Sequence, residues 1–388
     1  MLSVARSSRA IRNLSVSLLL APLLAGFAGC WQPKSVEQAW QSKPEPSIVL
    51  RPGCPASNVL FSPDGGVLAA GCERGRITLW ESGAWKVLRT FEHPPSAAGH
   101  SSLFQLRFSP DGRWLASQAG VGGLNGSLDV TAKLWDPASG RELRTCRCSA
   151  DLRVMFSPDS RLFLWQDPER NLRLLNLATS KELPTLPLGE ALFSPDSRLL
   201  ALSSRAGEVR VFEVATGSEV RALPGKNVAR AFSPDGLLLA VVTTERLRAY
   251  AQKGTIKLWG MNSGEEVRTL GSTRTIADVA FSPDGRWLGV RTVDDIELWE
   301  VKTAKQRSLD GYSEWDQLTF SPNSRFLAAG TGQELRLWDL GSGRKLLETD
   351  GYYHVSGNVV FSPDVRWLAL TTREDAVRLW DLSKLIHP

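Results

Sequence analysis

The sequence predicts an all-β fold, an eight-bladed β-propeller of four-stranded antiparallel blades. Two observations lead to this prediction. A variant of Phe-Ser-Pro-Asp-Gly occurs eight times in the 388 residues, at a spacing of roughly 40 residues that is typical of propeller repeats. A large apolar residue, most often Trp, follows each copy at a nearly constant distance. The copies begin at Phe61, Phe108, Phe156, Phe193, Phe232, Phe281, Phe320 and Phe361.

Each copy is predicted to form the turn between the first two strands of a blade. In the copy that ends at Gly285, proline presets φ, Ser and Asp hydrogen-bond their own backbone, and glycine accepts a positive φ. Residues 286–290 then read as the second strand, and residues 296–299, which alternate apolar and polar, as the third. A weaker fourth strand, such as residues 267–270, completes the blade. Val365 replaces the glycine in the last copy and suits such a turn poorly.

The spacing within the repeats supports one template used eight times. From the turn phenylalanine to the third-strand anchor the offset is 18 or 19 residues in six copies and 27 in the other two. Those two copies, in blades 2 and 5, contain a Gly-rich loop at 120–126 and a charged extension at 245–254. The eight anchors are Trp80, Trp135, Leu175, Phe212, Trp259, Trp299, Trp338 and Trp380.

The ends of the repeat region predict how the ring closes. The sequence stops soon after the eighth Trp-Asp, so the last blade lacks a fourth strand, whereas residues 47–50 form a strand-like segment without a partner. Joining the two gives eight complete blades and leaves no open sheet edge. A ring of seven blades with one displaced copy is the alternative.

Several of these motifs carry a family resemblance. Leu134-Trp135-Asp136 recurs as Leu-Trp-Asp at 337–339 and 379–381 and as Leu-Trp-Glu at 79–81 and 298–300. Over residues 47–388 the chain therefore resembles the tryptophan–aspartate (WD) repeat family of β-propellers. Members of that family usually carry a Gly-His pair before each first strand and an Asp before the third strand, both linked to the Trp through hydrogen bonds.

The chain departs from that family pattern. Only Gly99-His100 keeps the Gly-His form, and only Asp294 and Asp375 could take the role of the family Asp. We therefore expect apolar stacking between blades, rather than this hydrogen-bond network, to hold the ring together.

The first 46 residues are predicted to direct export. Residues 1–29 carry three arginines and no acid, followed by an apolar stretch that is short for a membrane-spanning helix, as in a signal peptide. Phe27-Ala28-Gly29-Cys30 resembles a bacterial lipoprotein processing site, which implies lipidation of Cys30 and a membrane anchor at the cell envelope. Residues 30–46 would then be a polar tether and residues 47–388 the propeller. A plain secretory signal and an uncleaved anchor are the alternatives.

The charge and the cysteines limit the classes of partner. The net charge of +5 falls to +2 without residues 1–29, because 43 basic and 41 acidic residues remain, and this does not indicate a nucleic-acid footprint. Cys54 and Cys72 flank the first hairpin almost opposite each other, so they could form a disulfide or remain two buried thiols. Cys146 and Cys148 could bind a metal as a Cys-x-Cys pair, but no His or Cys lies nearby in the sequence, which argues against a metal site.

The motifs of catalysis do not appear in this sequence. It has four histidines without metal-ligand spacing, no Gly-x-Ser-x-Gly elbow and no phosphate-binding Gly-Lys-Ser/Thr loop. The repeated serine beside an acid is interpreted as turn chemistry. We therefore expect no metal, no cofactor and no enzyme activity. An active site in the central channel would instead be built from inward-facing residues scattered through the chain, with no local motif.

The aromatic residues suggest a recognition surface. All four tyrosines fall in predicted connections that emerge on one face of a propeller, with Trp315 and His354 alongside. Tyr and Trp are enriched where surfaces recognise partners. The alternative is that some of them fill the space of a family histidine. The candidate partner-binding residues are Tyr250, Tyr312, Trp315, Tyr352, Tyr353 and His354.

These observations favour a non-enzymatic scaffold at the bacterial cell envelope that binds a protein or a peptide. The rival interpretation is an enzyme or small-ligand binder, lactonase-like or hydrolytic, with its site in the central channel. Inward carboxylates, amides or histidines at one depth of the channel would favour the rival, and small apolar residues would favour the scaffold. A cytosolic scaffold with an uncleaved N-terminus is a third interpretation.

Overall fold

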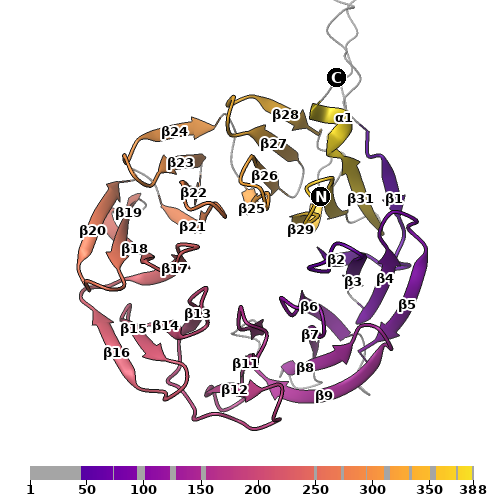
Figure 1. The fold of residues 1–388 in the computed structure, drawn as a ribbon, viewed down its shortest axis with the longest axis horizontal. Helices are drawn as coiled ribbons and strands as arrows, with labels where there is room; N and C mark the ends of the chain where they lie inside the picture. Colours follow the sequence, from indigo (N-terminus) through magenta and orange to yellow (C-terminus); the bar gives the residue numbers. More distant parts are fainter. Residues whose placement is uncertain are drawn as a thin grey trace, which may run out of the picture. The chain divides into compact units, whose positions relative to one another are not determined.

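Eight antiparallel β-sheets are arranged in a ring around a central opening (Figure 1). The computed structural model describes residues 45–72, 74–93, 101–122, 128–149, 154–248, 251–271, 275–293, 295–309, 315–331, 334–349, 355–372 and 375–386. All of these ranges belong to the one compact unit Lys43–Pro388. The predicted eight-bladed propeller is confirmed, and the seven-bladed alternative is wrong.

The blades, numbered in chain order, run from the innermost to the outermost strand. Blade 1 contains β2 (Ala56–Phe61), β3 (Val67–Cys72), β4 (Arg76–Glu81) and β5 (Val87–Glu92). Blade 2 contains β6 (Ser101–Phe108), β7 (Leu115–Gly122), β8 (Leu128–Asp136) and β9 (Arg141–Cys148). Blade 3 contains β10 (Met155–Phe156), β11 (Leu162–Gln166) and β12 (Leu172–Asn176), and blade 4 contains β13 (Glu190–Phe193), β14 (Leu199–Ser203), β15 (Val209–Glu213) and β16 (Glu219–Leu223).

The second half of the ring has the same order. Blade 5 contains β17 (Val228–Phe232), β18 (Leu238–Arg248), β19 (Ala251–Gly260) and β20 (Glu266–Gly271); blade 6 contains β21 (Ile276–Phe281), β22 (Trp287–Thr292), β23 (Ile296–Glu300) and β24 (Gln306–Leu309); blade 7 contains β25 (Trp315–Phe320), β26 (Phe326–Thr331), β27 (Leu335–Asp339) and β28 (Lys345–Glu348); and blade 8 contains β29 (Val355–Phe361), β30 (Trp367–Thr372), β31 (Ala376–Asp381) and β1 (Ile48–Leu50). A short helix, α1 (Leu382–Ile386), follows β31.

The ring closes through the N-terminal strand, as the sequence predicts. β1 pairs antiparallel with β31 in the register Ile48↔Leu379, Val49↔Arg378 and Leu50↔Val377. Figure 1 shows β1 on the outer side of β31, in the position that the fourth strand occupies in other blades. The last blade is thus built from both ends of the described chain.

Blade 3 differs from the prediction of four strands in every blade. Its sheet has three strands, and the following segment contributes only the bridges Leu172↔Leu186 and Leu175↔Glu182. Pro184 lies between these two bridges and Pro187 directly after them. Proline has no N–H to donate to a ladder, so a regular fourth strand cannot form here.

The core lies between the blades rather than inside each one. Eight clusters of buried apolar residues occur among the described residues, and each combines side chains of two neighbouring blades. The cluster between blades 8 and 1 joins Trp367 and Val377 to Val59, Leu68 and Trp80, so the closing interface has the same composition as the others. The expected apolar stacking between blades is confirmed.

Each third-strand anchor lies opposite one second-strand residue in the ladder. Leu68 pairs with Trp80 in blade 1 and Leu368 with Trp380 in blade 8. The second-strand partner is a leucine or phenylalanine in all eight blades and is fully buried in every one. These partners are Leu68, Leu115, Phe163, Leu200, Leu239, Leu288, Leu327 and Leu368.

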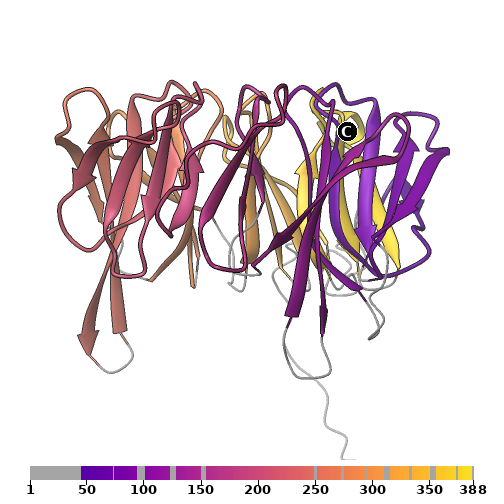
Figure 2. The ribbon, with the colours of Figure 1, turned by 90° about the horizontal axis from the view of Figure 1, so that it is seen from below.

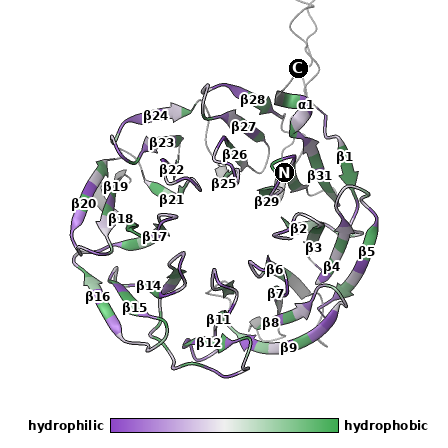
Figure 3. Cartoon of the chain, in the orientation of Figure 1, coloured by the Kyte–Doolittle hydropathy of each residue, from purple (hydrophilic) through white to green (hydrophobic). Residues whose placement is uncertain are grey.

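The outermost strands present charged residues at the rim of the ring. Hydrophilic and hydrophobic residues alternate along them (Figure 3). In β16 and β20 the exposed Val220 and Val267 each lie between a Glu and an Arg. Charged side chains on an edge strand oppose pairing with the edge of another sheet.

The repeated turn is stabilised by one set of hydrogen bonds. In blade 6, Ser282 Oγ donates to Asp284 Oδ1 (2.5 Å) and accepts from the N–H of Trp287 (2.9 Å). The same two bonds occur in all eight blades, with Asn323 in place of Asp in blade 7. The repeated serine is therefore buried and engaged in the turn.

Where serine replaces the turn glycine, it also links neighbouring blades. Ser160 Oγ accepts from the N–H of Asp111 in the preceding blade at 2.9 Å. Ser197 and Ser324 make the equivalent bonds to Asp159 and Asp284. Three blade interfaces thus gain a hydrogen bond at the inner turns.

Two extended hairpins replace the predicted loops of blades 2 and 5. β7 pairs with β8 from Leu115↔Trp135 to Gly122↔Leu128, and β18 pairs with β19 from Leu238↔Gly260 to Arg248↔Ala251. Residues 120–122 and most of 245–254 are therefore strand rather than loop. Figure 2 shows both hairpins projecting from the same face of the ring.

We predict that Val365→Gly stabilises the protein. Val365 adopts φ = 60° at the position where four other blades have glycine. A β-branched residue at such a φ is strained by about 1 kcal/mol or more, so the free energy of unfolding should rise by about 1 kcal/mol. Equilibrium denaturation measures this change.

The matched control is Gly285→Val. A Cβ at Gly285 would meet its nearest atom, Pro234 Cδ, at 3.7 Å, so the φ of 70° is the main cost of a side chain there. This variant should lose about the same free energy. Unchanged stability in both variants would contradict the strain at this turn position.

Candidate functional site

Polar residues line the central channel at one depth. The residue three positions before the turn phenylalanine lies on the innermost strand of its blade (Figure 1). In blades 1, 2, 4, 6, 7 and 8 it is polar, namely Asn58, Gln105, Glu190, Asp278, Gln317 and Asn358. This is the arrangement that the sequence argument assigns to a channel that binds a ligand.

A cavity of about 690 Å³ occupies the channel, and we call it the channel cavity. Its lining comes from blades 1, 2, 5, 6, 7 and 8 and includes three arginines, three amides and one carboxylate. These polar residues are Asn58, Gln105, Arg107, Arg230, Asp278, Arg291 and Asn358. Its volume lies within the usual range of small-molecule pockets.

Asn358 joins the last blade to the first at the channel wall. Its Nδ2 donates to the carbonyl oxygen of Val59 (2.6 Å), and its Oδ1 accepts from the N–H of Val59 (2.7 Å). One side chain thereby satisfies both backbone groups of a buried residue in the neighbouring blade. Asn358 is part of the ring closure.

Gln105 differs from Asn358, although it has the same place in blade 2. Its side chain is 3% exposed, and neither amide atom has a hydrogen-bond partner in the described part of the chain. Gln118, which is opposite Gln105 in the ladder, directs its own Nε2 to the carbonyl oxygen of Ser149. Buried amides without partners are rare because each lost hydrogen bond has a free-energy cost.

The charged groups of the channel form cross-blade and cross-strand pairs. Arg230 Nη1 lies 3.5 Å from Glu190 Oε2 of blade 4, while its Nε is buried without a partner among the residues described. Asp278 lies opposite Arg291 in the ladder of blade 6, and its Oδ1 accepts from the N–H of Val279.

The sequence search missed these channel residues. The fixed offset from the repeated phenylalanine could have identified them, because one position of the repeat must lie at one depth of the channel. Each residue on its own has no motif around it, so only comparison between the copies contains the signal.

A histidine network connects blade 2 to the strand before it. Trp135 Nε1 donates to Ser117 Oγ (2.8 Å), Ser117 Oγ lies 3.0 Å from His93 Nδ1, and His93 Nε2 lies 3.1 Å from Thr131 Oγ1. Ser117 Oγ accepts from Trp135, and the direction of its bond to Nδ1 and of the bond from Nε2 to Thr131 depends on the tautomer of the ring. This is the Trp-linked network that the resemblance implies.

The network uses His93 rather than His100, the histidine of the Gly-His pair, which lies outside the described residues. His93 directly follows β5, and residues 94–100 separate it from β6, so it lies further from the first strand than the motif suggests. In the other blades the position of Ser117 is apolar, with Ala70, Trp165, Leu202, Val241, Val290, Ala329 and Leu370. Blade 2 therefore has a network that apolar contacts replace elsewhere.

The protonation of His93 should affect stability. Burial, with a smaller contribution from Lys133, lowers the pKa of His93 from 6.5 to about 4, and Glu142 opposes this shift. Folding therefore favours the neutral ring. This contribution is complete above pH 6.5 and is lost as the pH falls towards 4.

We predict that His93→Gln reduces the loss of stability in acid. Between pH 7 and about pH 4, the free energy of unfolding should fall by about 3 kcal/mol less in the variant than in the wild type. Denaturant titrations at both pH values measure the difference. Carboxylates with a lowered pKa, such as Asp136, titrate equally in both proteins, so parallel pH profiles would contradict a neutral His93.

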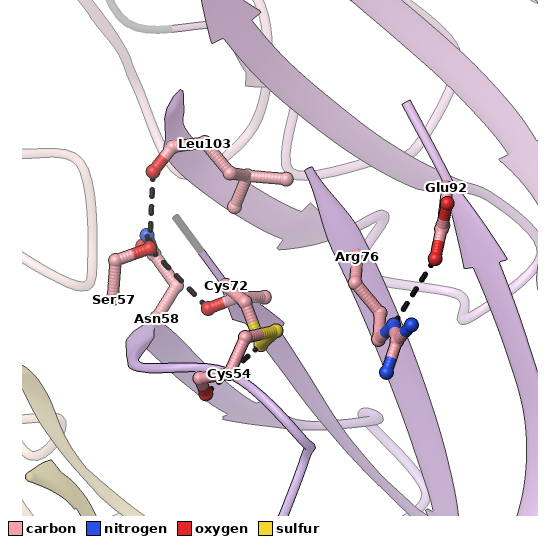
Figure 4. The surroundings of a disulfide bond; sticks show 8 residues. Cys54, Ser57, Asn58, Cys72, Arg76, Glu92 and Leu103 are labelled. Carbon is pink, nitrogen blue, oxygen red and sulfur yellow. Dashed lines mark hydrogen bonds and ion pairs between the residues drawn. A yellow bond between two sulfur atoms is a disulfide. The ribbon is translucent and has the colours of Figure 1, made fainter. Parts of the chain in front are cut away.

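Cys54 and Cys72 are joined by a disulfide with a Cα–Cα distance of 5.8 Å (Figure 4). Cys72 ends β3, and Cys54 lies in the segment from β1 to β2. The bond therefore fastens the segment that carries the ring-closing strand to the first blade. Cys146 and Cys148 are buried free thiols, and burial raises the pKa of Cys146.

We predict that Cys54→Ser with Cys72→Ser lowers the free energy of unfolding by about 3 kcal/mol, because the closed loop spans 18 residues. Chemical denaturation with and without a reductant measures this. The reductant should destabilise the wild type and leave the double variant unchanged. Equal sensitivity of both proteins would contradict a stabilising bond.

The predicted recognition surface falls mainly outside the described residues. Tyr250, Tyr312, Tyr352, Tyr353 and His354 all do so, as does Cys30. The backbone of Trp315 begins β25 and pairs with Thr331. Trp315 thus belongs to a first strand rather than to a connection.

Within the described ranges no group of three or more His, Cys, Asp or Glu side chains could hold a metal ion. No helix in that part of the chain has the length and apolar character to cross a membrane.

Comparison with known families agrees with this geometry. The family model described as WD domain, G-beta repeat matches residues 85–136, 264–292 and 305–339. The chain carries WD40 repeats. Each matched segment begins at or just before the outermost strand of one blade and continues into the next blade. The segments thus end in blades 2, 6 and 7, whose third-strand anchors are all Trp. No curated protein matches the sequence.

Two solved structures are similar in fold to this chain. The computationally designed Ika8 protein has a TM-score of 0.68 and 20% identity, covering 87% of this chain and 100% of that chain. The C-terminal WD40 domain of Sif2 has a TM-score of 0.66 and 14% identity, covering 86% of this chain and 97% of that chain. At these identities the likeness concerns the fold alone.

Proposed function

We propose that this WD40 propeller is a non-enzymatic scaffold that binds a protein or peptide partner at the bacterial cell envelope. WD40 propellers commonly serve protein interaction, and the repeats are the observation that carries the proposal. The histidine of the described residues, His93, is enclosed in a structural network. The repeated serines are engaged in turns, so neither supplies a nucleophile.

The face with the two extended hairpins supports a partner site. β7–β8 and β18–β19 project from it (Figure 2), and loops and hairpins on a rigid scaffold commonly carry binding residues. The candidate residues Tyr312, Tyr352 and Tyr353 precede β25 and β29 in the sequence and lie outside the described residues.

The envelope location rests on the N-terminal sequence and on the disulfide. Residues 1–29 have the features of a signal peptide, and Cys30 would be the lipidated first residue after its removal. A disulfide persists in oxidising compartments such as the periplasm, so the Cys54–Cys72 bond supports export.

We predict that Tyr352→Ala with Tyr353→Ala abolishes partner capture without lowering the melting temperature. Tyrosines at recognition surfaces contribute binding energy rather than core packing. Quantitative mass spectrometry of proteins cross-linked to the propeller in its own membranes measures capture. Val220→Ala, at the exposed rim, is the matched control. If every captured protein persisted in the double variant, the surface would be excluded.

The same membranes test the anchor. The wild type should partition into detergent and carry acyl mass on Cys30, while Cys30→Ser should stay in the aqueous phase. An intact mass that includes residues 1–29 without lipid would favour the cytosolic interpretation instead.

One observation favours the rival interpretation of a small-ligand binder. The channel cavity is lined by three amides, three arginines and one carboxylate, together with apolar residues such as Leu60 and Val360.

A further inference from the structure

One position of the repeat fills the interface between a blade and the next. It is the residue at the start of the second strand, whose N–H donates to the turn serine. In blades 6, 7 and 8 it is Trp287, Phe326 and Trp367, and each ring lies in the apolar cluster shared with the following blade. Trp114 packs in the same way between blades 2 and 3. Blades 3, 4 and 5 have leucine there, and blade 1 has Val67, the smallest of the eight.

A groove lies at the interface of blades 1 and 2, where this small residue leaves space, and we call it the blade 1–2 groove. Its volume of about 380 Å³ is at the lower end of the range for binding pockets and suits one large side chain. Its apolar lining includes Val67, Leu79 and Leu88 of blade 1 with Phe108 and Pro137 of blade 2.

Arg89, which also lines the groove, has a ladder position that covers a ring in another blade. It lies opposite Leu79 in blade 1, and Arg307 has the equivalent place in blade 6. The guanidinium of Arg307 lies 5.1 Å from the ring centroid of Trp287. Val67 replaces that ring in blade 1, and Arg89 has no hydrogen-bond, ion-pair or ring partner among the described residues. Its positive charge therefore complements the π face of an added ring.

The residue before Val67 departs from the repeat as well. Gly66 has the position of Arg286, Arg325 and Arg366, whose guanidinium groups lie 4.9 to 5.3 Å from the ring that follows each of them. Blade 1 thus lacks both members of the Arg-aromatic pair.

The ends of the groove limit the chemistry of an occupant. At the outer end Leu88 is 48% exposed beside Val87 at 59%, and contiguous exposed apolar side chains are typical of interaction sites. At the inner end Asp64 and Asp111 accept hydrogen bonds from the serine and backbone of their own turns. These two carboxylates repel an acidic ligand, so an uncharged aromatic group fits best.

We propose that the blade 1–2 groove binds an aromatic side chain, Trp or Phe, of a partner peptide. The ring takes the place that the chain's own rings take in four other blades, and Arg89 covers it as Arg307 covers Trp287. The groove adjoins the turns between first and second strands, at the opposite end of the strands from the two extended hairpins. It is therefore separate from the candidate tyrosine surface, and either site can exist without the other.

Calorimetric titration of the full-length protein tests the proposal. The probe is acetyl-Gly-Trp-Gly-amide, and acetyl-Gly-Leu-Gly-amide is the matched control, because leucine is apolar but offers Arg89 no ring. The Trp peptide should bind about fivefold or more tightly than the Leu peptide. No binding of the Trp peptide, or equal binding of both, overturns the proposal.

A variant that fills the groove from within locates the site. Gly66→Arg with Val67→Trp restores the pair of the other blades, and a Cβ at Gly66 would meet its nearest atom, Asp64 Oδ1, at an ordinary 3.5 Å. This variant should bind the Trp peptide about tenfold or more weakly and melt at a higher temperature, because its own ring occupies the groove. Wild-type affinity in the folded double variant overturns the proposal.

A second variant tests the cation. Arg89→Gln should weaken binding of the Trp peptide about threefold or more at an unchanged melting temperature. Arg344→Gln, at an exposed outer turn, is the control and should bind as the wild type does. Unchanged affinity in Arg89→Gln overturns the proposal, as does a wild-type dimer in sedimentation that the double variant lacks, because a second copy of this chain would then occupy the groove.

Discussion

The closed ring depends on one contact repeated at eight interfaces, the apolar wedge between neighbouring blades. A fully buried leucine or phenylalanine on each second strand lies opposite the anchor of the third strand. Burial of such a side chain contributes about 1.5–3 kcal/mol, whereas one hydrogen bond contributes about 1 kcal/mol net. This difference explains why seven blades manage without a serine at the position of Ser117, while none lacks the apolar pair.

A ring of identical wedges must also close, and closure places its own demands on both ends of the described chain. β1 supplies the missing strand, Asn358 bonds both backbone groups of Val59, and the disulfide ties the segment after β1 to blade 1. Three different kinds of interaction therefore meet at the interface of blades 8 and 1. The other interfaces are joined by continuous chain and need only the wedge and the inner turns.

The sequence predicted the parts of the fold that packing imposes on every copy. The turn motif, the anchors, the blade number and the closing strand could all be read from constant offsets. The features that it missed each occur in single blades rather than in every copy. Pro184 interrupts the fourth strand of blade 3, and the hairpins of blades 2 and 5 continue as strands where glycine or charge indicated loops. His93 was missed because residues 94–100 separate it from β6, whereas the motif places the histidine directly before the first strand. No repetition reveals such features.

The residues that face the channel vary between blades, whereas the buried second-strand partners hardly vary. Second-strand partners are nearly all leucine, because every interface imposes the same volume. Three positions before the turn phenylalanine, the described residues range over Asn, Gln, Glu, Ala and Asp, because no neighbour packs them uniformly. Asn358 has a structural task there, whereas Gln105 has lost hydrogen bonds in the same position. The residues at this position therefore differ between blades in ways that the packing of the ring does not dictate.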